Sequence, residues 1–96
     1  MKKAHARHIL VGSNAICIEL MEDLAKGADF SDVARNFSEC PSGHSGGDLG
    51  DFFEGDMVKE FNDAVFKGKA GQVIGPVKTQ FGHHIIEVIS LKDDKE

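Results

Sequence analysis

Histidines are the side chains in this 96-residue sequence best suited to chemistry, and two pairs of them have spacings typical of metal ligands. His5 and His8 stand three residues apart, and His83 and His84 are adjacent. Residues one or three apart on a strand point to opposite faces, so neither pair would close on one ion. A metal would need one histidine from each pair and a further ligand such as Cys40. We therefore expect no metal site and no cofactor.

His8 and His84 differ from the other histidines because each lies among apolar residues in a strand-like segment. His8 alternates with Ala6 and Leu10, and His84 alternates with Ile86. Side chains two apart on a strand share a face, so each histidine is expected to face the core. A single histidine of this kind is more often a hydrogen-bonded core residue than a ligand or a base. Two of them on neighbouring strands would form a buried imidazole pair.

A buried imidazole pair needs a hydroxyl or carbonyl group that fixes the tautomer of each ring. Thr79, in a hairpin just before His84, is the candidate partner. His5, near the terminus, and His44, in a glycine-rich loop, are expected to be solvated.

Cys40 is the candidate nucleophile, for which His8 or His84 would be the base. It follows a helix C-terminus, whereas a helix N-terminus would activate the thiol. The chain is also short for a thiol protease. Cys17, on the first predicted helix, is expected to pack in the core. Since no secretory signal is visible, both cysteines are expected to be free thiols.

Composition narrows the classes of partner. The net charge is −5 and the lysines are scattered, which argues against binding to nucleic acid or anionic membranes. No apolar run of signal-peptide length follows Met1, and none is long enough to span a membrane. We expect a cytoplasmic monomer, with residues 1–96 forming a single domain and only residues 92–96 frayed.

Hydrophobic periodicity predicts the elements that must position these side chains. Ser13 is expected to cap a first helix with an apolar stripe of Ile16, Leu20 and Leu24, ended by Gly27. Asp29 or Ser31 would cap a second helix and Asp56 a third. The predicted strands are 4–11, 48–53, 73–78 and 83–91, and the second and third helices present Phe30, Val33, Ala34 and Phe37, and Met57, Phe61, Ala64 and Val65.

The order β-α-α-loop-β-α-β-β predicts an α+β domain with a four-stranded, mostly antiparallel sheet. Alternation on both faces makes the first and last strands central, and Gly75-Pro76 places the third at an edge. The glycine-rich loop within residues 37–61 is long for so small a domain, which indicates a functional role. Leu49, Met57, Phe61 and Phe81 would together line a shallow pocket.

The chain resembles the parvulin-type peptidyl-prolyl cis/trans isomerases along nearly its whole length. Four ordered blocks carry the resemblance: HILV at 8–11, GADFSDVARNFSECPSG at 27–43, GGDLGDFFEGDMVKEF at 46–61 and GPVKTQFGHHII at 75–86. It implies the parvulin (FKBP-like) fold, a four-stranded antiparallel sheet surrounded by helices. It also implies rotation about Xaa–Pro bonds of unfolded or partly folded polypeptides, which assists folding.

The resemblance also implies roles for individual residues. His8 and His84 match the paired active-site histidines. Cys40 matches the family's Cys/Asp position, and Thr79 matches the hydroxyl that joins the hydrogen-bond network of the histidines. The pocket for the substrate proline ring matches Leu49, Met57 and Phe61, and its rim matches Gln80 and Phe81.

Phosphorylation-specific relatives carry a long basic loop after the first strand, whereas here Gly12 and Ser13 lead straight into the helix. We therefore expect no phosphoserine or phosphothreonine specificity, and an uncharged or apolar residue before proline. Since aspartate occupies the Cys40 position in relatives, a noncovalent mechanism is preferred. The alternatives are a holdase that binds proline-containing segments with little turnover, and a thiol or metal enzyme.

Overall fold

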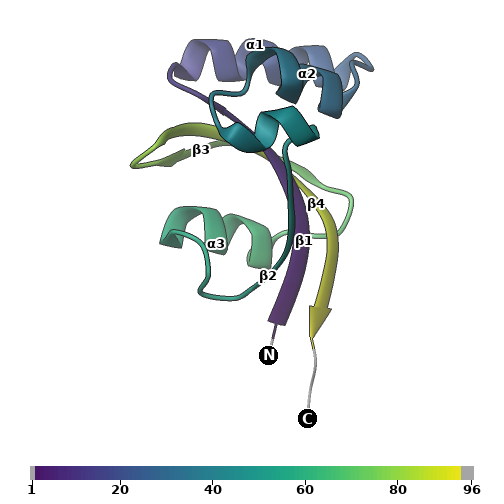
Figure 1. Cartoon of the computed structure of the whole chain (residues 1–96), viewed down its shortest axis with the longest axis vertical. Coiled ribbons are helices and arrows are strands. Elements are labelled where there is room, and N and C mark those ends of the chain that lie inside the picture. The colour runs from purple at the N-terminus through teal and green to yellow at the C-terminus, as the bar shows by residue number, and fades with distance from the viewer. Residues whose placement is uncertain (1, 94–96) are drawn as a thin grey trace.

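The computed structural model describes residues 2–93 and contains one antiparallel sheet of four strands in the order β2-β1-β4-β3. The strands are β1 (Lys2–Val11), β2 (Asp48–Phe53), β3 (Val73–Thr79) and β4 (Gly82–Asp93). The two long strands β1 and β4 run side by side in the middle of the sheet (Figure 1). The predicted α+β class, the central positions of β1 and β4 and the edge position of β3 are therefore confirmed.

Three α-helices and one 3₁₀ helix connect the strands: α1 (Asn14–Ala25), α2 (Phe30–Phe37), η1 (Pro41–Ser45) and α3 (Lys59–Lys67). The predicted caps of the first two helices are present. The Ser13 hydroxyl accepts a hydrogen bond from the Ile16 amide at 3.3 Å, and the Asp29 carboxylate accepts one from the Asp32 amide at 3.1 Å. Gly27, with φ of 109°, follows the end of α1. None of the helices in residues 2–93 is long and apolar enough to cross a membrane.

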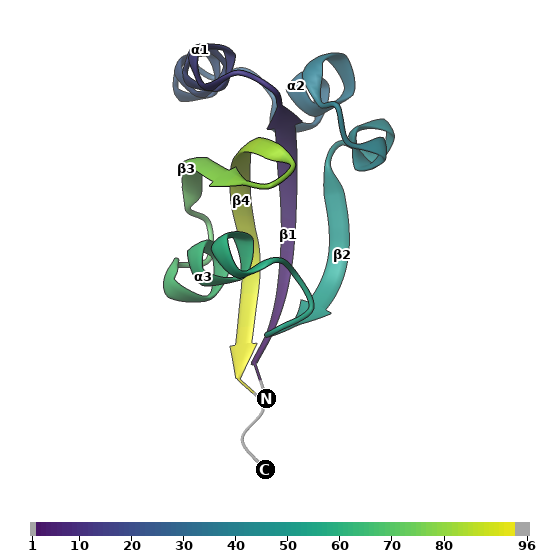
Figure 2. The ribbon, with the colours of Figure 1, turned by 90° about the vertical axis from the view of Figure 1, so that its left-hand side faces the viewer.

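Alternation along β1 divides the core between the two faces of the sheet. Ile9 and Val11 face α1 and α2, whereas Ala4 and Ala6 face α3. Figure 2 shows α3 in front of the sheet, with α1 and α2 gathered at its upper end. His8 has the same parity as Ala4 and Ala6, so the fold turns it towards the α3 side. The prediction that both faces of the central strands are covered is confirmed.

Two apolar side chains and one cap differ from the prediction. Ile16 is 46% exposed and Phe37 is 52% exposed, because α1 and α2 turn Cys17, Leu20, Val33 and Ala34 towards the sheet. The turn before α3 also differs: Asp56 accepts a hydrogen bond from the Phe53 amide at 2.8 Å and caps the turn, not the helix. The helix begins after Val58, so Met57 precedes it.

The glycine-rich stretch is largely ordered into η1 and β2. Cys40 is the N-cap residue of η1, so it stands between the end of α2 and the start of a short 3₁₀ helix. Position 47 must be glycine, because its φ is 85° and an added Cβ would lie 2.3 Å from the His8 carbonyl oxygen. The carbonyl of Gly47 in turn accepts the His8 amide at 2.9 Å. The stretch therefore packs directly against the strand that carries His8. Of the tail expected to fray, Lys92 and Asp93 belong to β4 and residues 94–96 lie outside the described residues.

Candidate active site

A pair of buried imidazoles lies at the centre of the sheet. His8 on β1 and His84 on β4 are 5% and 4% exposed, and their Nδ1 atoms are 3.0 Å apart. The two rings are nearly parallel, with 17° between their planes and 5.2 Å between centroids. The strands that carry them are paired neighbours, in which Leu10 is opposite His84. The predicted histidine pair is therefore present.

Hydroxyl groups bind the outer nitrogen of each imidazole. Thr79 Oγ1 lies 2.7 Å from His84 Nε2, as predicted, and also accepts the Phe81 amide at 3.1 Å. At the other end, His8 Nε2 lies 3.1 Å from the hydroxyl of Ser42. That hydroxyl donates to Cys40 Sγ at 3.3 Å. Cys40 therefore reaches the histidines through Ser42, which sequence reasoning treated only as part of a loop.

Burial keeps both imidazoles neutral near pH 7. Desolvation, followed by the charge of His84, lowers the pKa of His8 from 6.5 to about 4. The pKa of His84 is also lowered, first by desolvation and then by the neighbouring His83. Neutral imidazoles carry one donor and one acceptor nitrogen each, which is what a hydrogen-bonded pair requires.

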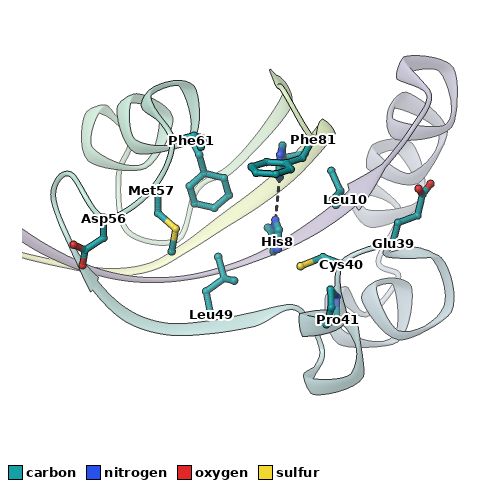
Figure 3. A pocket seen from close by; sticks show the side chains of 12 residues that line it. His8, Leu10, Glu39, Cys40, Pro41, Leu49, Asp56, Met57, Phe61 and Phe81 are labelled. Atoms are coloured by element: carbon teal, nitrogen blue, oxygen red, sulfur yellow. Dashed lines mark hydrogen bonds between the residues drawn. The ribbon is translucent and has the colours of Figure 1, made fainter.

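A pocket of about 520 Å³ opens over the histidine pair (Figure 3). Its apolar wall comes mainly from β2, α3 and the turn between them, and Phe61 forms its base beside the histidines. The Phe61 ring meets both imidazoles edge-on, at 5.5 Å from His8 and 5.4 Å from His84. The lining residues are His8, Leu10, Glu39, Cys40, Pro41, Leu49, Asp56, Met57, Val58, Phe61, Phe81 and His84.

The charged residues of the pocket are both acidic. Glu39 and Asp56 lie at opposite ends of it, and none of the twelve lining residues is lysine or arginine. Glu39 Oε2 also accepts a hydrogen bond from the Gly12 amide at 3.0 Å, so the carboxylate is held against the short connection between β1 and α1. The pocket offers an apolar slot with negative ends, which suits an apolar ring flanked by uncharged or basic groups.

Most of the predicted site residues meet here. His8, Cys40, Leu49, Met57, Phe61, Phe81 and His84 line the pocket, and Thr79 supports it from behind. Gln80 is exposed in the hairpin turn and does not line the pocket, so its contact with substrate stays a prediction. Sequence reasoning missed Leu10, Glu39, Pro41, Asp56 and Val58, although the alternation of Leu10 with His8 was a signal for the first of these.

The remaining histidines and cysteine lie outside the pocket. His5 is not fully solvated as expected, since its Nε2 lies 2.7 Å from Asp48 Oδ1. His44 is exposed, and His83 Nδ1 is buried without a hydrogen-bond partner within residues 2–93. Cys17 is a buried free thiol, as predicted, and burial raises its pKa. Within the same residues no three potential ligand side chains gather as a metal ion would require.

Known proteins resemble this chain in sequence and in fold. Residues 8–90 match the family model described as the rotamase, PPIC-type PPIase domain. The chain belongs to the PPIC-type peptidyl-prolyl isomerase family. The foldase protein PrsA of Geobacillus sp. (strain WCH70) is 48% identical over 94 residues, which are 97% of this chain and 34% of that protein. PrsA of Bacillus subtilis (strain 168) is 46% identical over 86 residues, 88% of this chain and 30% of that protein.

Solved structures of the family have the same fold. The crystal structure of the peptidylprolyl isomerase PrsA from Bacillus anthracis superposes with a TM-score of 0.95 at 38% identity, covering 99% of this chain and 44% of that one. The solution structure of the parvulin NmPin from Nitrosopumilus maritimus gives 0.83 at 38% identity, covering 94% and 98%. The parvulin resemblance and fold are therefore confirmed. The chain spans about a third of the length of the curated PrsA relatives named above, and nearly the whole of the free-standing parvulin.

Proposed function

We propose that this domain catalyses cis/trans isomerisation of Xaa–Pro bonds in polypeptides without a covalent intermediate. The observation that carries the proposal is an apolar pocket of about 520 Å³ with a neutral, buried histidine pair in its lining. Leu49, Met57 and Phe61 give it the walls that a proline ring would contact. Membership of the PPIC-type isomerase family supports the same activity.

Rotation about a prolyl bond needs no bond to break. The barrier of roughly 20 kcal/mol is the amide resonance lost when the peptide unit twists. A planar amide is more polar than a twisted one, so an apolar pocket disfavours the ground state relative to the transition state. Holding the proline ring in place while the preceding carbonyl turns supplies the rest of the lowering of this barrier. The pocket of this domain has both properties.

The contacts of Cys40 support a noncovalent role. A thiol nucleophile needs a base within hydrogen-bond reach. Among the described residues the partner of the Cys40 sulfur is the Ser42 hydroxyl, and no imidazole nitrogen bonds to it directly. In this proposal Cys40 tunes the hydrogen bonds of the histidine pair and does not attack the substrate.

The acidic ends of the pocket support a substrate without phosphate. Glu39 and Asp56 would repel a phosphoserine or glutamate placed before proline. The connection from β1 to α1 consists of Gly12 and Ser13 alone, so no basic loop offsets these charges. We propose that this domain prefers uncharged, apolar or basic residues before proline.

A protease-coupled assay on a panel of Xaa-Pro peptides tests the proposal. Substantial turnover with leucine before proline, and low turnover with glutamate and phosphoserine, is the expected result. An acidic preference would contradict the specificity. Tight binding of the same peptides without turnover would instead establish the alternative, a proline-segment holdase, which the open apolar pocket also suits.

A pair of exposed phenylalanines gives a matched control for the position of the site. Phe81 is 61% exposed at the pocket, and Phe37 is 52% exposed away from it. Phe81→Ala should lower kcat/KM several-fold, whereas Phe37→Ala should leave it unchanged. Since both rings are exposed, neither change should unfold the domain. Equal effects of the two substitutions would place the substrate elsewhere.

The proposal extends to assistance in protein folding, and to the cellular location and oligomeric state of the domain. The PrsA relatives are named foldases, which supports a role on unfolded or partly folded proteins. The expected cytoplasmic, monomeric state, with no nucleic-acid or membrane partner, stays a prediction. Analytical ultracentrifugation and fractionation of cells that express the chain would test it.

A further inference from the structure

Five polar side chains at the pocket form one continuous line of hydrogen bonds. Its four contacts run from the Thr79 hydroxyl to His84 Nε2 (2.7 Å), from His84 Nδ1 to His8 Nδ1 (3.0 Å), from His8 Nε2 to the Ser42 hydroxyl (3.1 Å) and from that hydroxyl to Cys40 Sγ (3.3 Å). Every nitrogen of both imidazoles is used in the line. The proton on each ring therefore depends on the groups at both ends.

Two members of this line are not part of the pocket lining. His8, His84 and Cys40 line it, whereas Ser42 and Thr79 do not. We therefore expect Ser42 to act on the substrate through the groups that it binds. Its position in η1 is fixed independently of its side chain, because its carbonyl accepts the Gly47 amide at 2.8 Å.

The direction of the line follows from one backbone group. The Phe81 amide donates to Thr79 Oγ1 at 3.1 Å, and a backbone N–H cannot reverse its role. If Thr79 also accepted from His84, its own hydrogen would find no acceptor among residues 2–93. With Thr79 donating to His84 Nε2, every N–H and O–H proton in the line has an acceptor, and the hydrogen left without one among residues 2–93 is the Cys40 S–H, a weak donor that loses least by it.

The other protons then follow in sequence. His84 holds its proton on Nδ1 and donates it to His8 Nδ1. His8 holds its proton on Nε2 and donates it to Ser42, which donates its own to Cys40 Sγ. Each neutral imidazole has one donor and one acceptor nitrogen, so reversing one bond would reverse the whole line.

We propose that Ser42 is a positioning residue that joins Cys40 to the histidine pair, and that the Phe81 amide sets the direction of all four hydrogen bonds. The line holds the His8 ring and the Cys40 sulfur in fixed orientations at the pocket wall. Its effect on turnover rests on the proposed isomerase function, whereas the proton positions do not.

Nitrogen-15 NMR of histidine-labelled protein at neutral pH tests the proton positions without any substitution. His84 should be the Nδ1–H tautomer and His8 the Nε2–H tautomer. The opposite tautomers in both rings would overturn the direction that we infer from Phe81. Because this readout needs no substrate, it stands apart from any failure of the isomerase assay.

Three serine variants test the link. Ser42→Ala removes the acceptor of His8 Nε2–H and the donor to Cys40, so His8 should populate both tautomers. Alkylation of Cys40, followed by mass spectrometry, should slow roughly three- to tenfold, as expected for loss of one hydrogen bond to sulfur. Ser42→Thr should restore both readouts. Ser45→Ala, in the same 3₁₀ helix and exposed, is the control and should change neither.

Turnover adds a third readout. kcat/KM should fall roughly three- to tenfold in Ser42→Ala and recover in Ser42→Thr. Unchanged His8 tautomers and an unchanged alkylation rate in Ser42→Ala, with its fold intact by circular dichroism, would overturn the link. A change in both without a change in turnover would confine Ser42 to the resting network and remove its positioning role.

Discussion

Acidification should destabilise this domain through His8, well before most of its carboxylates are protonated. In the folded chain burial lowers the pKa of His8 from 6.5 to about 4. The unfolded chain therefore takes up a proton near pH 6.5, while the folded chain resists it. The stability contributed by neutral His8 is complete above pH 6.5 and is lost as the pH falls towards 4.

The size of the effect follows from the shift. Each pKa unit is worth about 1.36 kcal/mol, and roughly 1.5 units separate pH 6.5 from pH 5. The free energy of unfolding should fall by about 2 kcal/mol between pH 7.5 and pH 5. The pKa of His84 is lowered too, so its contribution has the same sign. A loss of this size is a large fraction of the stability of a small domain.

Urea unfolding followed by far-ultraviolet circular dichroism, at several pH values, measures this dependence. Fluorescence is unsuitable because the chain has no tryptophan or tyrosine. His8→Gln removes the titrating group while keeping a polar side chain, so its stability should be lower at pH 7.5 but depend less on pH. His44→Gln, which changes an exposed histidine, is the control and should follow the wild-type curve.

One result would refute the reasoning. If His8→Gln lost as much stability between pH 7.5 and pH 5 as the wild type, with an unchanged m-value, His8 would not be held neutral by burial. The pH dependence would then belong to other groups.

Further substitutions test the network and the wall of the pocket. Cys40→Asp should keep substantial isomerase activity and Cys40→Ala should lose only part of it, whereas loss of all turnover in a folded Cys40→Asp would indicate covalent catalysis. Thr79→Val should lower the free energy of unfolding by about 1–3 kcal/mol and should also slow turnover, since it removes a buried hydrogen-bond partner of His84. Thr79→Ser should restore both quantities. Gly47→Ala should lower the free energy of unfolding, measured in urea, more than Gly50→Ala does. Both positions have positive φ, where a Cβ costs about 1–2 kcal/mol, but only the Cβ at position 47 would also collide with the His8 carbonyl. Equal losses for the two glycines would show that the strand adjusts to the contact.

Strand alternation carried most of what the sequence could predict. It placed His8 and His84 on buried faces of central strands, and family resemblance added Cys40 and Thr79. Strand alternation could not predict that Ser42 belongs to the site. The contact from Ser42 to His8 depends on the 3₁₀ turn that brings η1 against β1, and turns of this kind have no hydrophobic period. Local spacing gives no such information.

The wrong predictions about the helices, one of a buried face and one of a cap, have a related origin. An apolar stripe at helical spacing defines a face, but packing selects which side of it is covered. In α1 the buried side is that of Cys17 and Leu20, so Ile16 remains exposed at the edge. Asp56 was a reasonable cap by composition, yet the turn after β2 used its carboxylate for the Phe53 amide.

The pairing of His8 with His84 joins residues 76 positions apart in the chain. Both histidines come from the two central strands, and β4 is the last element of the sheet. Contacts of such sequence separation form only when β1 and β4 have met, which makes them slow to form. A chain emerging from the ribosome, N-terminus first, would therefore lack half of its histidine pair until β4 had been made. The proposed isomerase activity would thus report that β4 has joined the sheet, and a fragment that ends before β4 should be catalytically silent.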